Sequence, residues 1–281
     1  MTQTTEYQAT AAASGGAATE KFVEKAKAGP DTSPERVSAL ASEVLSAVHD
    51  VIRRHHVTYE EYDALKAWLI QVGADGEWPL FLDVFVESVV EEVASEHREG
   101  SKGTIEGPYY VPGAPALAAD ATLPMRADEA GTPLLFYGRV RDVAGNPVAG
   151  ATLEVWHADD AGFYSQFAPG LPEWNLRGTV TADADGTFRI RTIRPAPYQI
   201  PTDGSTGALI RSAGWHAWRP AHLHLKVSAA GCQPITTQLY FEGDEHVADD
   251  IASAVKPELV LRPDVAPNGE EARYDFVLDP A

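Results

Sequence analysis

The stretch Arg219-Pro-Ala-His-Leu-His-Leu-Lys-Val227 alternates, over its last six residues, between polar and aliphatic side chains. Because successive side chains of a β-strand point to opposite faces, His222 and His224 share one face and the three aliphatic residues share the other. The aliphatic face suits the core of a packed sheet. The two imidazoles, about 7 Å apart along the strand, suit either a solvated face or a metal site, since imidazole is a common metal ligand.

The rest of the second half continues this alternation in short segments. We expect three pairs of neighbouring strands, at residues 135–141 with 151–157, 177–182 with 187–192, and 221–228 with 235–241, then late strands at 257–261 and 274–278. A short helix is expected near residues 250–255. Short strands joined by Gly, Pro and Asp-Gly turns are typical of a β-sandwich. No Gly-rich loop follows a strand, so the sequence carries no nucleotide-binding signature.

The first hundred residues show the helical period instead. Ser33-Pro34 predicts a helix start, and apolar residues then recur every three or four positions up to Ile52. Thr58-Tyr-Glu-Glu61 is a capping box that opens a second helix, which we expect to end at Gly73. A third helix is predicted from about residue 79 to residue 98. The wide apolar stripes imply burial against a sheet, a sister helix or a partner chain.

These patterns divide the chain into three parts. Residues 1–19 are rich in Ala and Gly and predict a disordered or loosely held tail. Residues 20–104 are predicted to form an α-helical dimerisation domain, and residues 105–281 a mainly β catalytic domain, a β-sandwich of mixed topology. This second domain opens with a Pro- and Gly-rich connection, residues 105–133, whose length and tyrosines favour a packed pocket loop over a linker.

The charge balance and the cysteine count exclude some classes of protein. With 22 Lys and Arg against 41 Asp and Glu, the formal net charge is −19, so the surface repels nucleic-acid phosphates and anionic lipid headgroups. Cys232 is the only cysteine, which rules out an intrachain disulfide and a Cys-based zinc site and fits a cytoplasmic protein. No apolar run approaches the ~20 residues that span a bilayer, so we do not expect a membrane protein.

Carboxylates are one source of further ligands for a metal at the two histidines. Asp159, Asp160 or Glu242 would complete a two-histidine, one-carboxylate site for ferrous iron or zinc.

Tyrosine is the other source. A trivalent cation holds a phenol as phenolate although the ordinary pKa of tyrosine is about 10. Tyr164 ends the turn after a predicted strand, and Tyr198 lies between prolines that restrict the backbone. Each is also typical of a packed aromatic residue in a sandwich, so the residues alone leave both ligand sets open.

Several short motifs in the second half stand in a recognisable order. They are Phe136-Tyr-Gly-Arg-Val140, Gly145, Val148, Leu153-Glu-Val155, Gly162 with Tyr164, Pro197-Tyr198, and Arg219-Pro-Ala-His-Leu-His224. At matching spacings they resemble the signature and the iron-site motifs of the intradiol ring-cleavage dioxygenases. The resemblance extends over essentially the whole chain, and the helical N-terminal part is similar to that of the catechol 1,2-dioxygenase branch, whereas the protocatechuate branch lacks it.

The resemblance implies a ligand set. Tyr164, Tyr198, His222 and His224 would bind one non-haem Fe(III) per subunit, with Tyr198 and His224 axial and the other two equatorial beside a hydroxide. Two phenolates and a hydroxide would neutralise the ferric charge, which a partly dry cavity tolerates. Tyr198 would leave the metal and accept a proton from the substrate.

The resemblance also implies roles for residues around the metal. Arg219 would be a cation that stabilises negative charge developing on the substrate, and Gln238 would lie just behind the ligands. Substrate contacts are implied at Gly107, Pro108 and Tyr109 on the pocket loop, at Val72, Asp75 and Gly76 after the second helix, and at Ile251 and Ala252. The alternative for each of these pocket residues is a packing role, and for Asp75 a helix terminus.

The implied activity is cleavage of catechol by O2 to cis,cis-muconate, as in bacterial degradation of aromatic compounds through the β-ketoadipate pathway. Chlorocatechol or hydroxyquinol cleavage at the same iron is the first alternative. Two other classes stay open: a zinc or ferrous enzyme with a carboxylate ligand, and a non-enzymatic sandwich that binds a ligand or partner. The family further implies a homodimer joined through the N-terminal helices, and lipid held between those helices.

Overall fold

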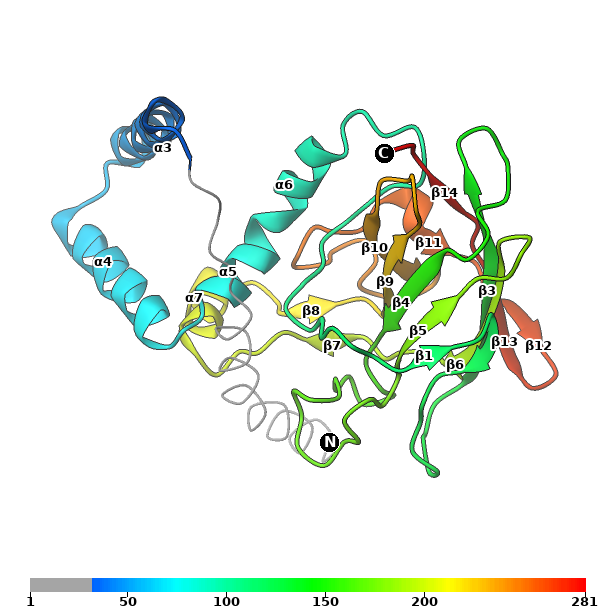
Figure 1. The fold of residues 1–281 in the computed structure, drawn as a ribbon. Helices are drawn as coiled ribbons and strands as arrows, with labels where there is room; N and C mark the ends of the chain where they lie inside the picture. The colour runs from blue at the N-terminus through cyan, green and yellow to red at the C-terminus, as the bar shows by residue number, and fades with distance from the viewer. Residues whose placement is uncertain (1–31) are drawn as a thin grey trace.

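The structure is a computed structural model that describes residues 32–281 (Figure 1). The expected tail, residues 1–19, and residues 20–31 of the expected helical domain lie outside the described residues. The described chain runs through α3 (Pro34–His55), α4 (Tyr59–Ala74), α5 (Trp78–Phe85) and α6 (Glu87–Ala94) before it enters the strands. The prediction of a mainly β protein with N-terminal helices is confirmed.

The first two helices begin where the sequence predicts. Ser33 caps α3 by accepting a hydrogen bond from the amide of Arg36, and Thr58 and Glu61 form the capping box of α4. α4 extends one residue beyond the expected end at Gly73. None of the helices in the described part of the chain has the length and apolar content needed to cross a lipid bilayer.

The third predicted helix is wrong in one respect, because it is two helices. The backbone of Val86, at φ −130° and ψ −37°, interrupts the helix between α5 and α6. Neither Gly nor Pro marks this position, so the local sequence gives no signal for the break.

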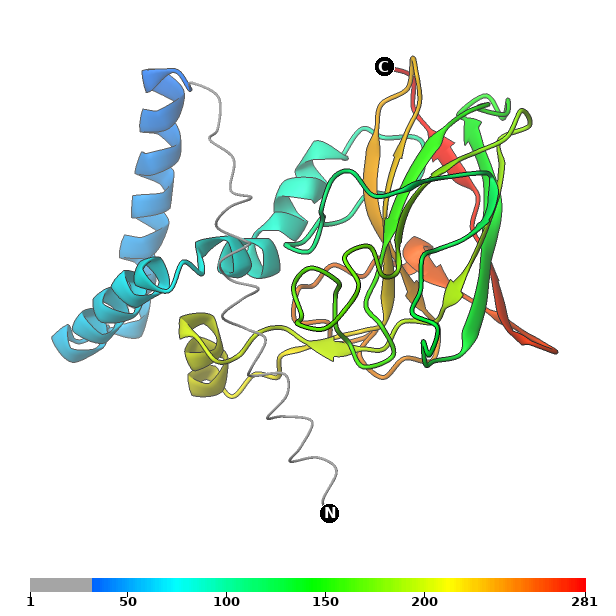
Figure 2. The same cartoon turned by 60° about the horizontal axis from the view of Figure 1, so that its bottom comes forward.

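Two six-stranded sheets form the sandwich, with mixed parallel and antiparallel pairing. The first sheet has the order β1 (Ala116–Leu117), β5 (Arg177–Thr181), β4 (Thr152–Trp156), β9 (His222–Ser228), β10 (Ile235–Phe241), β11 (Val260–Leu261). The second has the order β12 (Asp264–Ala266), β13 (Gly269–Arg273), β3 (Pro133–Asp142), β6 (Thr187–Ile193), β2 (Asp120–Thr122), with β14 (Phe276–Leu278) paired to β3. A short ribbon joins β7 (Tyr198–Gln199) to β8 (Trp218–Arg219). Figure 2 shows the two sheets as adjacent layers, with α3 and α4 extending away from them.

Only the last of the three predicted strand pairs is correct. β9 and β10 are antiparallel neighbours. β3 pairs with β6, and β4 pairs with β5 and β9, so the chain crosses between the sheets twice where hairpins were expected. A strand shows the same alternation of buried and exposed side chains whether it pairs in the expected hairpin or with its observed neighbour. The alternation therefore does not identify the partner strand.

Three elements of the second half were also mispredicted. The strand expected at residues 257–261 begins as a 3-10 helix, Pro257–Leu259, and only Val260–Leu261 are strand. Residues 250–255 form no helix, and only residues 251 and 252 lie in a turn. A helix that was not expected, α7 (Ser205–Ala213), follows the β7 strand. Its Ser, Thr and Gly residues have low helix propensity, so tertiary contacts rather than local preference account for it.

Two hydrophobic clusters organise the packing. The first lies between the sheets and includes Leu223, Leu225 and Val227 of β9. The second covers the outer face of the first sheet and includes Leu80 and Val84 of α5. The histidine face of β9 therefore points into the second cluster and is buried rather than solvated.

Candidate active site

Three donor atoms meet where β9 begins. The phenol oxygen of Tyr164 lies 3.0 Å from Nε2 of His224 and 3.4 Å from Nε2 of His222, and the two Nε2 atoms are 3.0 Å apart. Each side chain is at most 3% exposed. Two ligands that stand at a right angle, each about 2.1 Å from one metal ion, are also about 3.0 Å apart. The three atoms therefore have the spacing of ligands around a single ion.

The protonation of the imidazoles also fits metal binding. Nδ1 of His222 donates to the carbonyl of Pro220 at 2.7 Å, which leaves a lone pair on Nε2. Burial lowers the pKa of His222 to about 3 and that of His224 well below its usual value, so both rings are neutral. Nδ1 of His224 is buried and has no hydrogen-bond partner among the described residues, and its ring stacks on Trp156.

Tyr164 is positioned by the turn that follows β4. Asp159 accepts hydrogen bonds from the amides of Ala161 and Phe163, which closes the turn. Gly162, at φ +83°, packs on Tyr198 so closely that a Cβ atom there would lie 2.8 Å from the Cβ of Tyr198. Burial raises the pKa of the Tyr164 phenol well above its ordinary value, so the phenol ionises only beside a strong positive charge.

Tyr198 reaches the same place from the β7–β8 ribbon. Its ring centre lies 5.6 Å from that of His222 and 5.5 Å from that of Tyr164. The ribbon pairs Tyr198 directly with Arg219. Burial raises the pKa of Tyr198, and the guanidinium of Arg219 acts in the opposite direction. Two phenols with two neutral imidazoles are a donor set that fits a hard trivalent ion such as Fe(III).

Arg219 is a buried cation with a full set of partners. Its side chain is ion-paired with Asp250, with N–O distances of 3.0 and 3.1 Å, and it donates to Oε1 of Gln238 at 2.9 Å. Tyr240 donates to the same oxygen of Gln238. Although burial opposes it, this pairing raises the pKa of Arg219 well above its ordinary value, so its charge is permanent. The nearest guanidinium nitrogen lies 3.5 Å from Nε2 of His222.

Asp250 and Tyr240 were not identified from the sequence. An enclosed arginine often has a carboxylate partner, but the many carboxylates of the sequence gave no way to select Asp250. Nothing in the local sequence marks Tyr240.

The pocket loop is bound to both the helices and the sheet. Glu87, the first residue of α6, accepts the amides of Glu106 and Gly107 at 2.8 and 3.3 Å. Gln238 donates to the carbonyl of Ile105 at 2.9 Å. A Cβ atom on Gly107, at φ +70°, would lie 3.6 Å from Cε1 of His224. The loop backbone therefore lies directly against the ring of His224.

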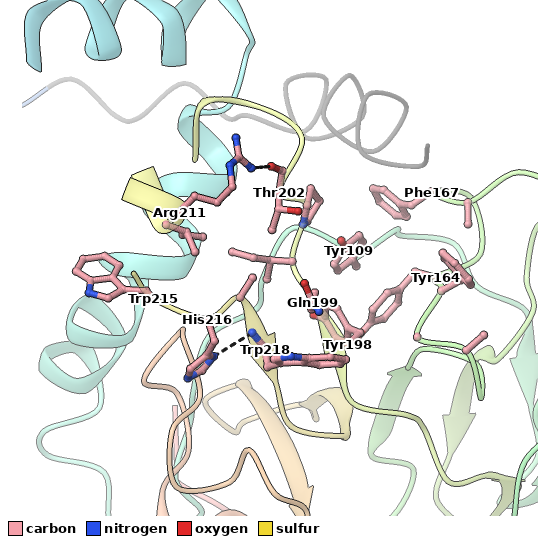
Figure 3. A pocket seen from close by; sticks show the side chains of 18 residues that line it. Tyr109, Tyr164, Phe167, Tyr198, Gln199, Thr202, Arg211, Trp215, His216 and Trp218 are labelled. Atoms are coloured by element: carbon pink, nitrogen blue, oxygen red, sulfur yellow. Dashed lines mark hydrogen bonds between the residues drawn. The ribbon is translucent and has the colours of Figure 1, made fainter. Parts of the chain in front are cut away.

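A cavity of about 500 Å3 opens beside the tyrosines (Figure 3). Tyr109, Tyr164 and Tyr198 lie on one side of it, and Trp215 and Arg211 of the α7 segment lie on the other. The other apolar residues that line it are Ala161, Phe163, Phe167, Ala168, Ile200, Pro201, Ile210, Ala217 and Trp218. This volume is typical of small-molecule sites and exceeds that of a single aromatic ring.

Some of the predicted pocket residues line the cavity and others lie outside its lining. Tyr109 lines the cavity and stacks on Tyr164, with ring centres 4.2 Å apart. Pro108 precedes it in the same turn. Ile251 and Ala252 lie beyond the lining, where the amide of Ala252 binds Asp250 and the amide of Ile251 binds the carbonyl of Trp218.

Val72, Asp75 and Gly76 lie behind α7 rather than in the cavity wall. Val72 is fully buried, and Asp75 accepts the amide of Ser205, the first residue of α7. Gly76, at φ +70°, turns the chain towards α5. Their contact with a substrate stays a prediction.

The structure does not place Asp159, Asp160 or Glu242 as a carboxylate ligand beside the two histidines. Within residues 32–281, no group of three or more His, Cys, Asp and Glu side chains is placed to hold a metal ion. Asp159 closes its own turn and pairs with Arg126, and Glu242 pairs with Arg262.

Comparison with known protein families covers nearly all of the described chain. The family model described as "Dioxygenase" matches residues 105–280, and the one described as "Catechol dioxygenase N terminus" matches residues 34–102.

Individual relatives agree with these matches. The chain is 47% identical to chlorocatechol 1,2-dioxygenase of Rhodococcus opacus over 229 residues, which is 80% of this chain and 89% of that protein. It is 37% identical to catechol 1,2-dioxygenase of Acinetobacter baylyi over 237 residues, 80% of this chain and 76% of that protein. The crystal structure of 3-chlorocatechol 1,2-dioxygenase from Rhodococcus opacus 1CP superposes with a TM-score of 0.85 at 47% identity, covering 89% of this chain and 100% of that one.

Proposed function

The chain belongs to the intradiol dioxygenase family, and on that premise we propose that it opens the ring of a catechol with O2 at a ferric ion. From catechol itself the product is cis,cis-muconate, which retains both oxygen atoms of O2. The observation that carries the proposal is the meeting of the Tyr164 oxygen with the Nε2 atoms of His222 and His224 beside the cavity. Tyr198 is the fourth proposed ligand, and one ion is held per subunit.

The protein supplies charge and proton acceptors to this chemistry. A ferric ion bound by these residues would supply Lewis acidity, which favours loss of the catechol protons, and a redox-active centre for the reaction of the ring with O2. Tyr198, which would be a phenolate while it binds the metal, is the proposed acceptor of one catechol proton, because it lies beside the cavity and beside Arg219. The hydroxide expected beside the same metal would accept the second proton.

Arg219 is proposed to stabilise negative charge on the reacting substrate. Its guanidinium is held by Asp250 and Gln238, so no reorganisation is needed as the charge develops. The ring of Tyr109, which is stacked on Tyr164, and the apolar lining of the cavity exclude water from the face of the substrate ring. In this proposal Gly107, Pro108 and Tyr109 border the substrate, and Val72, Asp75, Gly76, Ile251 and Ala252 shape the pocket from behind.

Catechol and ring-chlorinated catechols are the two candidate substrates. The 47% identity to a chlorocatechol 1,2-dioxygenase, against 37% to a catechol 1,2-dioxygenase, favours the chlorinated compounds. The cavity volume is large enough for a substituted ring. A methyl-sized difference in a pocket is worth about 1–3 kcal/mol, roughly 10- to 200-fold in kcat/KM, so direct measurement decides between them.

The test is a steady-state comparison on the iron-loaded protein. Oxygen uptake and muconate absorbance are followed with catechol, methylcatechols, chlorocatechols, hydroxyquinol and protocatechuate. We expect a wine-red protein that is active on catechol or chlorocatechol. Its kcat/KM for protocatechuate should be at least about 10-fold lower than its kcat/KM for these substrates. A colourless protein with full iron content would refute the ferric tyrosinate site, and no oxygen uptake with any catechol would refute the activity.

The ligand assignment has its own prediction. Tyr164→Phe and His222→Ala each remove a donor atom, so bound iron and colour should both be lost. Metal analysis after dialysis and the visible spectrum measure this, with His97→Ala, an exposed histidine outside the cavity lining, as the control. Wild-type iron content and activity in either ligand variant would contradict the assignment.

A homodimer and bound lipid are part of the same proposal. α3 contains no buried residue, and an apolar hollow of about 330 Å3 on α4 is lined by Tyr62, Leu65, Lys66, Leu69 and Ile70. These surfaces suit a partner chain or an acyl chain. The cytoplasmic location expected from the sequence stays a prediction.

A further inference from the structure

Arg177 is a second buried arginine beside the site, and it has no role in the function proposed above. It begins β5, where it is paired with Trp156, and only 1% of its surface is exposed. Its guanidinium donates to three oxygens: the hydroxyl of Ser165 at 2.8 Å, the carbonyl of Ser165 at 3.1 Å and the carbonyl of Tyr109 at 2.8 Å.

These three bonds hold both neighbours of Tyr164. Ser165 follows Tyr164 in the chain, and the ring of Tyr109 is stacked on that of Tyr164 with an angle of 4° between the planes. The guanidinium carbon lies 5.9 Å from the ring centre of Tyr164 and 5.8 Å from that of Phe167. Arg177 therefore joins the loop that carries Tyr164 to the pocket loop that covers it.

The charge of Arg177 lacks the usual compensation. Arg219 is paired with Asp250, but within residues 32–281 Arg177 forms no ion pair with a carboxylate, and its guanidinium faces the ring of Tyr164. A guanidinium stays protonated at neutral pH, so Arg177 carries a positive charge in this position. A buried cation without an opposite charge is costly, and a tyrosine bound to a ferric ion carries a negative oxygen.

We propose that Arg177 is a positioning residue for Tyr164, which holds the phenol oxygen at the two histidines through Ser165 and Tyr109 and provides the positive charge that a metal-bound tyrosinate faces. This inference rests on the proposed function. Groups just outside a metal's ligands commonly change affinity or activity 10- to 100-fold when they are removed.

Two substitutions separate the bonds from the charge. Arg177→Lys keeps the charge but replaces the planar, multidentate donor by a single ammonium group, so we expect iron affinity and kcat to fall about 10-fold or more, with a smaller change in KM. Arg177→Met removes both, and loss of the positive charge should also move the tyrosinate-to-iron absorption of the bound fraction to longer wavelength than in Arg177→Lys. Arg189→Met, an exposed arginine on β6, is the control.

The outcomes distinguish this inference from the proposed function. If the wild-type protein binds no iron or cleaves no catechol, the proposed function fails. If the wild type is red and active and Arg177→Lys has wild-type iron affinity and kcat, the positioning role is refuted. An identical absorption maximum in Arg177→Met and Arg177→Lys refutes the charge role. If Arg177→Met does not fold, Ser165→Ala is used in its place, because it removes one of the three hydrogen bonds and keeps the charge of Arg177. Wild-type iron affinity and kcat in both Ser165→Ala and Arg177→Lys would overturn the proposal.

Discussion

Asp250 is the residue on which the position of Arg219 depends. Both side chains are almost fully buried, and both guanidinium–carboxylate contacts are about 3 Å long. Asp250 also accepts the amides of Ala252 and Ala254, so one carboxylate binds the arginine and orders the turn that follows it. Burial favours the neutral acid, but the charge of Arg219 holds the pKa of Asp250 below its ordinary value.

Asp250→Asn is predicted to destabilise the protein and to reduce activity. Removing one partner of a buried ion pair leaves an uncompensated charge, which costs about 3–5 kcal/mol. Urea unfolding of the variant should show this loss, and kcat should fall because Arg219 is no longer held beside His222. Asp249→Asn, at the exposed neighbouring position, is the control. A loss of stability below about 1 kcal/mol would show that the pair is not what holds Arg219.

Among the elements, the break between α5 and α6 has the clearest consequence for the site. Because the helix is interrupted at Val86, Glu87 is the first residue of a new helix, α6. Glu87 at that start accepts two amides of the pocket loop, and Gly107 in turn lies against His224. The helical region thereby contacts the candidate metal site through one carboxylate.

Glu87→Gln is predicted to loosen the pocket loop. The amide side chain places an NH2 group against one of the two backbone N–H groups, and a buried donor left unsatisfied costs about 1–3 kcal/mol. Unfolding free energy should fall by that amount and KM should rise, while Glu92→Gln, on the exposed side of the same helix, should change neither. Wild-type stability and KM in Glu87→Gln would show that the loop does not depend on this contact.

At the scale of the whole molecule, an apolar face remains exposed on the helices. On α3 it comprises Val37, Leu40, Val44, Leu45, Val48, Val51 and Ile52, with exposed fractions of 39–61%, and α6 adds Val89, Val90 and Val93. Exposed apolar surface of this extent is typical of a protein interface.

Val44→Asp combined with Val48→Asp is predicted to produce a monomer. Two carboxylates in an apolar interface would be desolvated without partners, which raises the dimer dissociation constant by at least about 100-fold. Sedimentation should therefore change from a dimer to the 30.2 kDa chain. Ser46→Asp, on the opposite side of α3 at 100° per residue, is the control. A wild-type protein that sediments as a monomer would refute the dimer.

The sequence alone determined the elements whose signals are local. The alternation of β9, the caps of α3 and α4 and the change from helical to extended period all follow from side-chain chemistry within a few residues, and the structure confirms them. The sequence motifs also pointed to four donor residues. The structure brings Tyr164, His222 and His224 within hydrogen-bond distance of one another, and Tyr198 lies beside His222.

Only the tertiary structure decided which strands are neighbours and which charges share the buried site. β3 and β4 lie in different sheets, although their sequences suit a hairpin, because both pairings bury the same alternating residues. Asp250, Tyr240 and Arg177 come to the site from separate strands and turns, and a single buried charge does not specify its partner in the sequence. Partners so distant in the chain are chosen by the packing of the two sheets, which no local pattern contains.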